Sequence, residues 1–134
     1  MIAINAENHI MGRLASETAK MLLSGEQIVI VNAGKVVISG NPNHAIDIYT
    51  NRIAMRGDAL HGPFYPKKPQ EALRRTIRGM LPYRTTRGAH AFKLLKVFNS
   101  VPEEFAKTEL RRLPEAENKL SGKFITLEGV LKGL

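Results

Sequence analysis

The chain has 134 residues, with 20 basic and 12 acidic side chains, and its formal net charge is +8 at neutral pH. This length fits one domain over residues 1–134, and the absence of cysteine excludes disulfides and thiolate metal sites. No apolar run reaches the roughly 18 residues of a membrane span, and the N-terminus does not resemble a signal peptide. We therefore expect a soluble cytoplasmic protein, with no membrane association, whose excess charge binds a polyanion.

The first forty residues alternate between strand and helix patterns. Residues 2–5 form a short apolar run that predicts a strand, and a helical apolar stripe runs from about 12 to 24, with Gly25 as its C-terminal stop. Residues 27–31 and 36–38 are β-branched runs typical of strands that are covered on both faces. Asn41-Pro42 then supplies an N-cap and a first helical proline for a helix that ends near Ala54. This order predicts an α/β fold with helices covering a largely parallel sheet.

Residues 56–69 interrupt this pattern and predict a long basic loop. The segment contains three prolines and two glycines, and its GPFYPKKP portion places Phe64 and Tyr65 beside Lys67 and Lys68. Loops of this length in compact domains are usually functional or disordered. Two interpretations remain open: the aromatic rings stack on unpaired bases, or they anchor the loop to the domain, with one ring for each task also possible.

The second half of the chain has weaker patterns. We expect a helix from about 69 to 81, a basic loop to 88, a short helix near 89–94 and a strand at 96–98. The tail, about 103–134, is amphipathic, and its elements are not assigned.

The charge excess is concentrated in one segment, residues 52–96. This segment holds eleven basic residues against two acidic ones, whereas the rest of the chain holds nine basic and ten acidic residues. In the helix that begins at Pro69, the helical spacing places Arg74, Arg75 and Arg78 on one arc and the apolar residues on the opposite arc. Arginine suits bidentate contacts with phosphate. The segment therefore predicts a nucleic-acid-binding face, the alternative being an ordinary solvated helix face.

Two other function classes are less well supported. An enzyme acting on an anionic substrate would need a nucleophile or an acid–base pair. The four histidines are far apart in sequence, and Asp58 and Glu71 are better explained as adjusting the charge of the basic segment than as an acid–base pair. A DNA-binding regulator would need a recognition helix and a dimer interface, and neither is evident. The patterns favour a non-catalytic RNA-binding protein.

Several motifs, in order along residues 2 to about 102, resemble the ribosomal L-thirteen family of the large subunit. They are GRLASETAKMLLSG, IVIVNA, VVISGN, GPFYPKKP, RRTIRGMLP and RG followed by AFKLLKVF. The compact N-terminus and the GPFYPKKP loop resemble the archaeal and eukaryotic branch, and the overall length favours an archaeal member. Beyond about residue 102 the family is variable, so the resemblance implies nothing about the tail.

The resemblance implies a three-layer α/β/α domain around a four-stranded, largely parallel sheet, with a basic extended loop. It also implies binding of large-subunit rRNA, contact with neighbouring large-subunit proteins and a role in early subunit assembly. It implies no catalysis, no small-molecule substrate, no metal and no cofactor. The match carries the family's RNA-facing region onto these residues: Arg74, Arg75, Arg78, Gly79, Met80, Leu81, Pro82, Arg87 and Gly88. Together with the charge pattern, it gives this set of expected RNA-binding residues: Arg52, Arg56, Phe64, Tyr65, Lys67, Lys68, Arg74, Arg75, Arg78, Arg84, Arg87, Lys93 and Lys96.

Overall fold

The computed structural model describes residues 1–54, 60 and 62–132, and it has an α/β fold. Its strands and helices follow in this order: β1 (Ile2–Asn5), α1 (Met11–Leu23), β2 (Ile28–Val31), η1 (Ala33–Lys35), β3 (Val37–Ser39), α2 (Pro42–Ile53), α3 (Pro69–Gly79), α4 (Thr86–Lys93), β4 (Leu95–Val97), η2 (Glu103–Phe105), β5 (Phe124–Thr126) and α5 (Leu127–Leu131). No helix in these described stretches is long and apolar enough to cross a bilayer.

The central sheet is parallel and has the order β1-β2-β4. Strand β2 lies in the middle, paired with β1 from Ile2↔Ile28 onward and with β4 from Ile28↔Leu95 onward. All four residues of β2 are buried, as its continuous apolar run predicts. The α/β class and the parallel sheet are thus confirmed.

The expected four-stranded sheet is wrong for the described residues, because the second apolar run does not join it. Asn32 adopts a left-handed conformation (φ 60°), and η1 follows directly, so the chain leaves the sheet. Strand β3 instead pairs antiparallel with β5 near the C-terminus, and of its three residues only Val37 is buried. At the outer edge of β1, a single parallel bridge joins Ile4 to Arg111.

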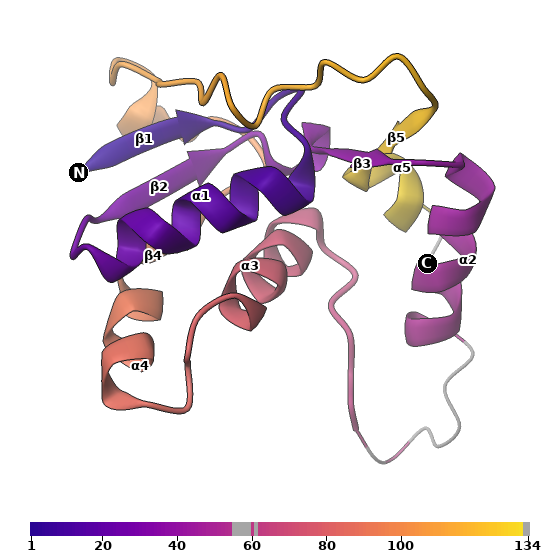
Figure 1. The fold of residues 1–134 in the computed structure, drawn as a ribbon, viewed down its shortest axis with the longest axis horizontal. Helices are drawn as coiled ribbons and strands as arrows, with labels where there is room; N and C mark the ends of the chain where they lie inside the picture. Colours follow the sequence, from indigo (N-terminus) through magenta and orange to yellow (C-terminus); the bar gives the residue numbers. More distant parts are fainter. Residues whose placement is uncertain (55–59, 61, 133–134) are drawn as a thin grey trace.

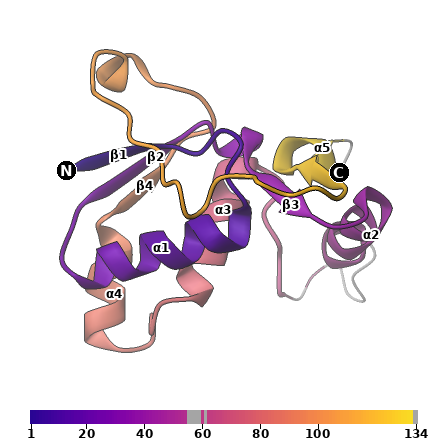
Figure 2. The same ribbon diagram turned by 45° about the horizontal axis from the view of Figure 1, so that its top comes forward.

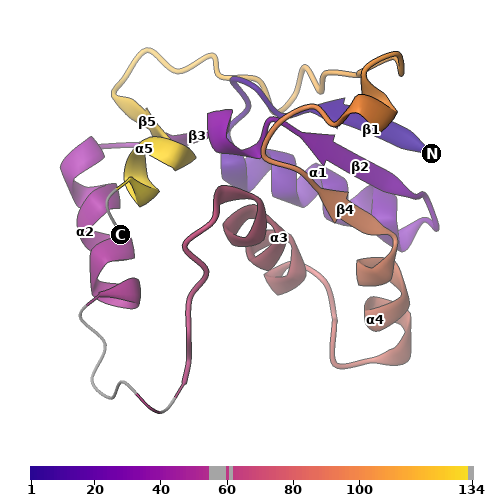
Figure 3. The same ribbon diagram turned by 180° about the vertical axis from the view of Figure 1, so that it is seen from behind.

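Helices α1, α3 and α4 lie on one side of the sheet, whereas β3, β5, α2 and α5 group beside it (Figures 1 and 2). In the segment after β4, the Phe98 N–H donates to the Ile30 carbonyl, and Arg111 then pairs with Ile4 at the outer edge of β1. This segment therefore crosses the face of the sheet opposite the helices (Figure 3). On that face, the expected second helical layer is reduced to the single turn of η2.

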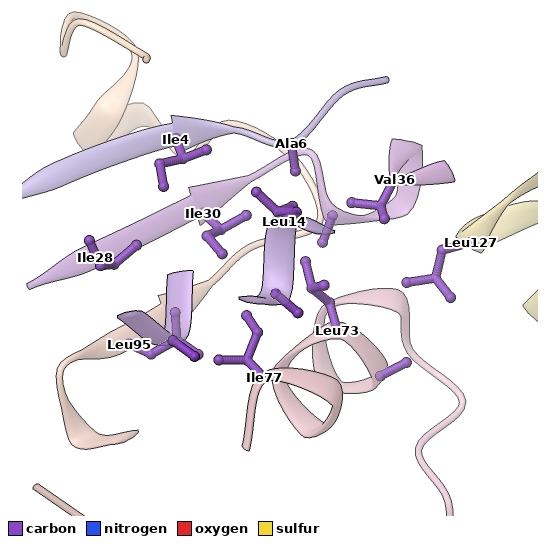
Figure 4. Packing of buried hydrophobic residues seen from close by; sticks show 14 of the residues in the cluster. Ile4, Ala6, Leu14, Ile28, Ile30, Val36, Leu73, Ile77, Leu95 and Leu127 are labelled. Atoms are coloured by element: carbon purple, nitrogen blue, oxygen red, sulfur yellow. The ribbon is translucent and has the colours of Figure 1, made fainter. Parts of the chain in front are cut away.

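The main core lies between the sheet and helices α1 and α3 (Figure 4). Leu14 of α1, Ile30 of β2 and both Leu73 and Ile77 of α3 are fully buried there. Burying side chains of this size contributes about 1.5–3 kcal/mol each. The core therefore holds α3 in a fixed rotation about its axis, and this rotation decides which of its residues face solvent.

The C-terminal segment is tied to the first turn of the chain. His9 is fully buried; its Nε2 accepts the Leu113 N–H at 3.1 Å, and its Nδ1 lies 2.9 Å from the Glu7 carbonyl. The Ile10 N–H donates to the Ala116 carbonyl at 2.8 Å. Because burial desolvates the imidazole, the pKa of His9 is lowered below its usual value. The neutral ring therefore acts as a structural link between two distant segments.

Candidate nucleic-acid interface

The arginines of α3 face outward because the other side of the helix is buried. Ala72, Leu73 and Ile77 pack into the core, as their helical spacing predicts. The helix ends at Gly79, and Met80, which follows it, is 44% exposed. One of the outward arginines is exposed and the other two are half-buried; this arginine face consists of Arg74, Arg75 and Arg78.

Each guanidinium of the arginine face lies over an aromatic ring from a different part of the chain. The distances from guanidinium carbon to ring centroid are 4.2 Å for Arg74 over Phe92, 4.1 Å for Arg75 over Tyr65 and 4.9 Å for Arg78 over Tyr83. Such contacts contribute about 0.5–1 kcal/mol at exposed sites. A guanidinium that lies over a ring can still donate N–H groups from its edge to an oxyanion.

Between these arginines lies a cleft of about 180 Å³, which we call the arginine cleft; its lining residues are Pro66, Glu71, Arg74, Arg75, Arg78 and Phe92. The Nε atom of Arg78 is buried and has no hydrogen-bond partner. Within the described part of the chain, the ion pairs join Lys20 to Glu17 and Arg112 to Glu117, and none involves an arginine of α3. The cleft thus presents three cations and one carboxylate, a net positive site suited to a phosphate.

A second pocket, the tyrosine pocket, lies on the other side of Arg75. Its volume is about 200 Å³, and it is lined by Tyr49, Arg52, Tyr65, Pro66, Ala72, Arg75, Thr76 and Gly79. The Arg52 guanidinium lies 5.5 Å from the Tyr65 ring centroid and 5.9 Å from that of Tyr49. The lining is therefore aromatic and apolar, with two cations at its wall.

The two rings of the basic loop have different environments. Tyr65 is half-buried and packs against the core cluster, beneath Arg75, whereas Phe64 is 54% exposed. Arg75 also donates from Nη1 to the Phe64 carbonyl at 3.3 Å. Of the two interpretations left open by the sequence, anchoring to the domain fits Tyr65. Arg56, with the rest of residues 55–59 and residue 61, lies outside the described residues.

The basic loop between α3 and α4 is held in place by a helix cap. The Thr85 hydroxyl accepts the Gly88 N–H at 3.2 Å and donates to the Pro82 carbonyl at 2.7 Å. This cap starts α4 three residues earlier than its apolar pattern predicts. It fixes the exposed Arg84 and Arg87 on either side of the cap, and Arg84 shares the Tyr83 ring with Arg78 of the arginine face.

The other predicted site residues are distributed over a wider surface. Lys67 and Lys68 are exposed just before α3, and Lys93 is exposed in the last turn of α4. Lys96 pairs with Val29, and its neighbour Leu95 faces the helical core, so Lys96 lies on the opposite face of the sheet. The structure brings the arginines and aromatic rings together, but it does not bring Lys96 to the same face.

Sequence reasoning missed three rings: Tyr49, Tyr83 and Phe92. Their only signal was proximity in sequence to arginines, and helix phase does not reveal which ring lies beneath which guanidinium. Two positions in the region that the family resemblance carried over, Leu81 and Gly88, are buried. These two residues pack inside the domain.

The side chains of His9, His44 and Asp47 lie outside this surface. His44 and Asp47 are both exposed on α2, and His9 is a buried structural link. Nowhere among residues 1–54, 60 and 62–132 do three His, Cys, Asp or Glu side chains cluster as metal ligands would. What the surface provides is a set of oriented cations with planar rings.

Comparison with known proteins identifies the family. The family model described as "Ribosomal protein L13" matches residues 1–104. The chain belongs to the ribosomal protein L13 family. This is a family of structural ribosomal proteins and not of enzymes, which excludes the enzymatic alternative.

Curated relatives named "Large ribosomal subunit protein uL13" come from several archaea. The protein of Archaeoglobus fulgidus is 40% identical, and the match covers 98% of this chain and 85% of that protein. For Picrophilus torridus the identity is 44%, with 98% and 95% covered, and for Methanosarcina barkeri it is 47%, with 95% and 92% covered. The expected archaeal type within the L13 family is thus confirmed.

Proposed function

We propose that this L13-family chain is a structural constituent of the large ribosomal subunit that binds large-subunit rRNA and supports early subunit assembly. It does so by means of oriented cations, without catalysis or a cofactor. The observation that carries the proposal is the stacking of all three α3 arginines on aromatic rings around one cleft. Neighbouring large-subunit proteins are the expected protein partners.

The proposed contact surface is the full set of residues expected from the sequence, with the arginine face at its centre: Arg52, Arg56, Phe64, Tyr65, Lys67, Lys68, Arg74, Arg75, Arg78, Arg84, Arg87, Lys93 and Lys96. Cations that replace condensed counterions around converging RNA segments release those ions, and this release favours binding. Because rRNA within a subunit is irregular, its single-stranded loops offer bases to aromatic side chains as well as phosphates to arginines.

The position of Lys96 on the opposite face of the sheet suggests a division of contacts. We infer that the helical face carries the main RNA contact, while Lys96 reaches a different RNA segment. A protein with basic side chains on two faces can hold two RNA segments at a fixed separation. Holding them in this way supports the scaffolding role in assembly.

The test replaces Arg74, Arg75 and Arg78 together by alanine and measures the affinity for large-subunit rRNA at several salt concentrations. Each lost phosphate contact lowers the slope of log K against log salt by about 0.9, so we expect a decrease of up to about 3. The control removes three exposed lysines outside the basic segment, Lys107, Lys119 and Lys123, and leaves the slope nearly unchanged. Circular dichroism of each variant checks the fold.

A parallel titration uses an unrelated structured RNA of equal length. A preference of about tenfold or more for the rRNA, about 1.4 kcal/mol, at physiological salt supports a dedicated site. Equal affinities that decrease together with salt would reduce the interaction to non-specific attraction. An unchanged slope in the arginine variant would rule out α3 as the phosphate-binding element.

A further inference from the structure

The tyrosine pocket is not explained by phosphate binding. Its lining contains the rings of Tyr49 and Tyr65 together with Ala72 and Gly79, a surface with few groups that an oxyanion would use. Unlike the arginine cleft, it has only two cations, and both are engaged with the tyrosine rings. A ligand for this pocket must be flat and largely apolar, and it must tolerate cations at its edge.

A nucleobase has these properties. Its faces are apolar and polarisable, and its edge carries hydrogen-bond acceptors that a guanidinium can meet. Aromatic side chains and arginine planes are the usual surfaces on which proteins stack unpaired bases. Both kinds of surface line this pocket, since Arg52 lies within 6 Å of both tyrosine ring centroids.

The two cavities also adjoin each other. Arg75 and Pro66 line both the arginine cleft and the tyrosine pocket, so one residue pair forms the wall between them. Arg75 is itself fixed by its stacking on Tyr65 and by its bond to the Phe64 carbonyl. A phosphate in the cleft therefore places the rest of its nucleotide beside the pocket entrance.

We propose that the tyrosine pocket receives one unpaired RNA base, next to a phosphate held in the arginine cleft. This inference rests on the proposed rRNA-binding function and adds a preference for single-stranded or looped RNA. A base in a duplex is stacked and paired, so entering the pocket would require its extrusion. The pocket thus favours the junctions and loops of a folded RNA over its helices.

Two variants alter the pocket without removing a charge: one fills it and the other removes a stacking ring. Gly79 lies in the pocket wall, and a Cβ built there meets no atom within 4 Å, so we expect Gly79→Leu to fit the helix and to narrow the cavity. Tyr49→Leu keeps an apolar side chain against the core but removes the ring. The matched control is Gly122→Leu, because Gly122 is also exposed, has equally open space and lies away from the pocket.

The probes are a ten-nucleotide single-stranded RNA and the same strand built from stable abasic residues, which carry the same number of phosphates. Because stacking of one base contributes roughly a tenfold change in affinity, the unmodified protein should bind the base-bearing strand about ten times more tightly. Gly79→Leu and Tyr49→Leu should bind both strands with the affinity of the abasic one. Their salt slopes should equal that of the unmodified protein, and Gly122→Leu should retain the preference.

Equal binding of the two strands by the unmodified protein, with a normal salt slope, would overturn the base pocket and leave phosphate binding intact. Retention of the tenfold preference in both pocket variants would also overturn it, because the base would then be held elsewhere. Absence of measurable binding to either strand, with a folded protein, would overturn the rRNA-binding function and the pocket together.

Discussion

Gly88 provides a test of how the basic loop before α4 is held. It is buried in the first turn of α4, and a Cβ at this position would overlap the carbonyl group of Pro82 and lie 2.8 Å from the Tyr83 nitrogen. These are backbone atoms, so no side-chain rotation relieves the overlap. The loop is also tied to the helix by the Thr85 hydroxyl, which bonds to both Gly88 and Pro82. Gly88→Ala must therefore displace the loop.

Two opposing effects set the size of the change in stability. Alanine gains up to about 1 kcal/mol over glycine from helix propensity. Forcing a methyl group into a filled site costs about 1–3 kcal/mol, and backbone neighbours favour the upper part of that range. We expect a net destabilisation of about 1–2 kcal/mol. For a chain of this size that corresponds to a decrease in Tm of about 3–8 °C.

The assay compares Gly88→Ala with Gly79→Ala by thermal and urea unfolding. At Gly79 a Cβ meets no atom within 4 Å, so the same substitution should be neutral or stabilising by up to about 1 kcal/mol. Displacement of the loop also moves Arg84, so Gly88→Ala should bind RNA more weakly than Gly79→Ala does. Equal stability of the two variants would refute the close approach of Gly88 to Pro82.

Three further predictions concern the link at His9, the carboxylate in the cleft and the cap of α4. Because burial lowers the pKa of His9, the unfolded chain binds the proton more tightly than the folded one, so the unfolding free energy is full above about pH 6.5 and decreases below it. Urea unfolding at pH 7.5 and 5.5 should show a smaller decrease of the unfolding free energy in His9→Gln than in the unmodified protein. Glu71→Gln should raise the affinity for RNA at low salt, measured by titration, while the loss of a first-turn acid destabilises α3 by about 0.3–1 kcal/mol. Thr85→Ala should lower the unfolding free energy by about 0.5–2 kcal/mol, whereas Thr85→Ser retains most of it.

The elements that sequence patterns predict well are those with local signals. The buried run of β2, the stop at Gly25 (φ 91°) and the cap at Asn41, whose side chain accepts the Asn43 N–H at 3.0 Å, each depend on neighbours in the chain. The pairing of β3 with β5 depends on residues more than eighty positions apart. No local pattern encodes such a partner, and for this reason the predicted sheet had one strand too many.

The same distinction applies to the candidate interface. Helix phase predicts that Arg74, Arg75 and Arg78 are outward, and the burial of α3 confirms that orientation. Helix phase cannot predict that Phe92 lies beneath Arg74 and Tyr83 beneath Arg78. The turn held by the α4 cap brings those two rings to α3. For Lys96 a usable signal was present: strand alternation places it opposite Leu95, which is apolar and faces the core.

The cations of this surface differ in kind from those in the rest of the chain. The chain contains ten arginines and ten lysines, and residues 52–96 hold seven of the arginines but only four of the lysines. If net charge alone sufficed for RNA binding, either residue would serve, because both carry one positive charge. Only the planar guanidinium can stack on a ring and still present parallel donors at its edge. The three stacked arginines of α3 use this property. A cleft built in this way fits the proposed phosphate contact in shape as well as in charge.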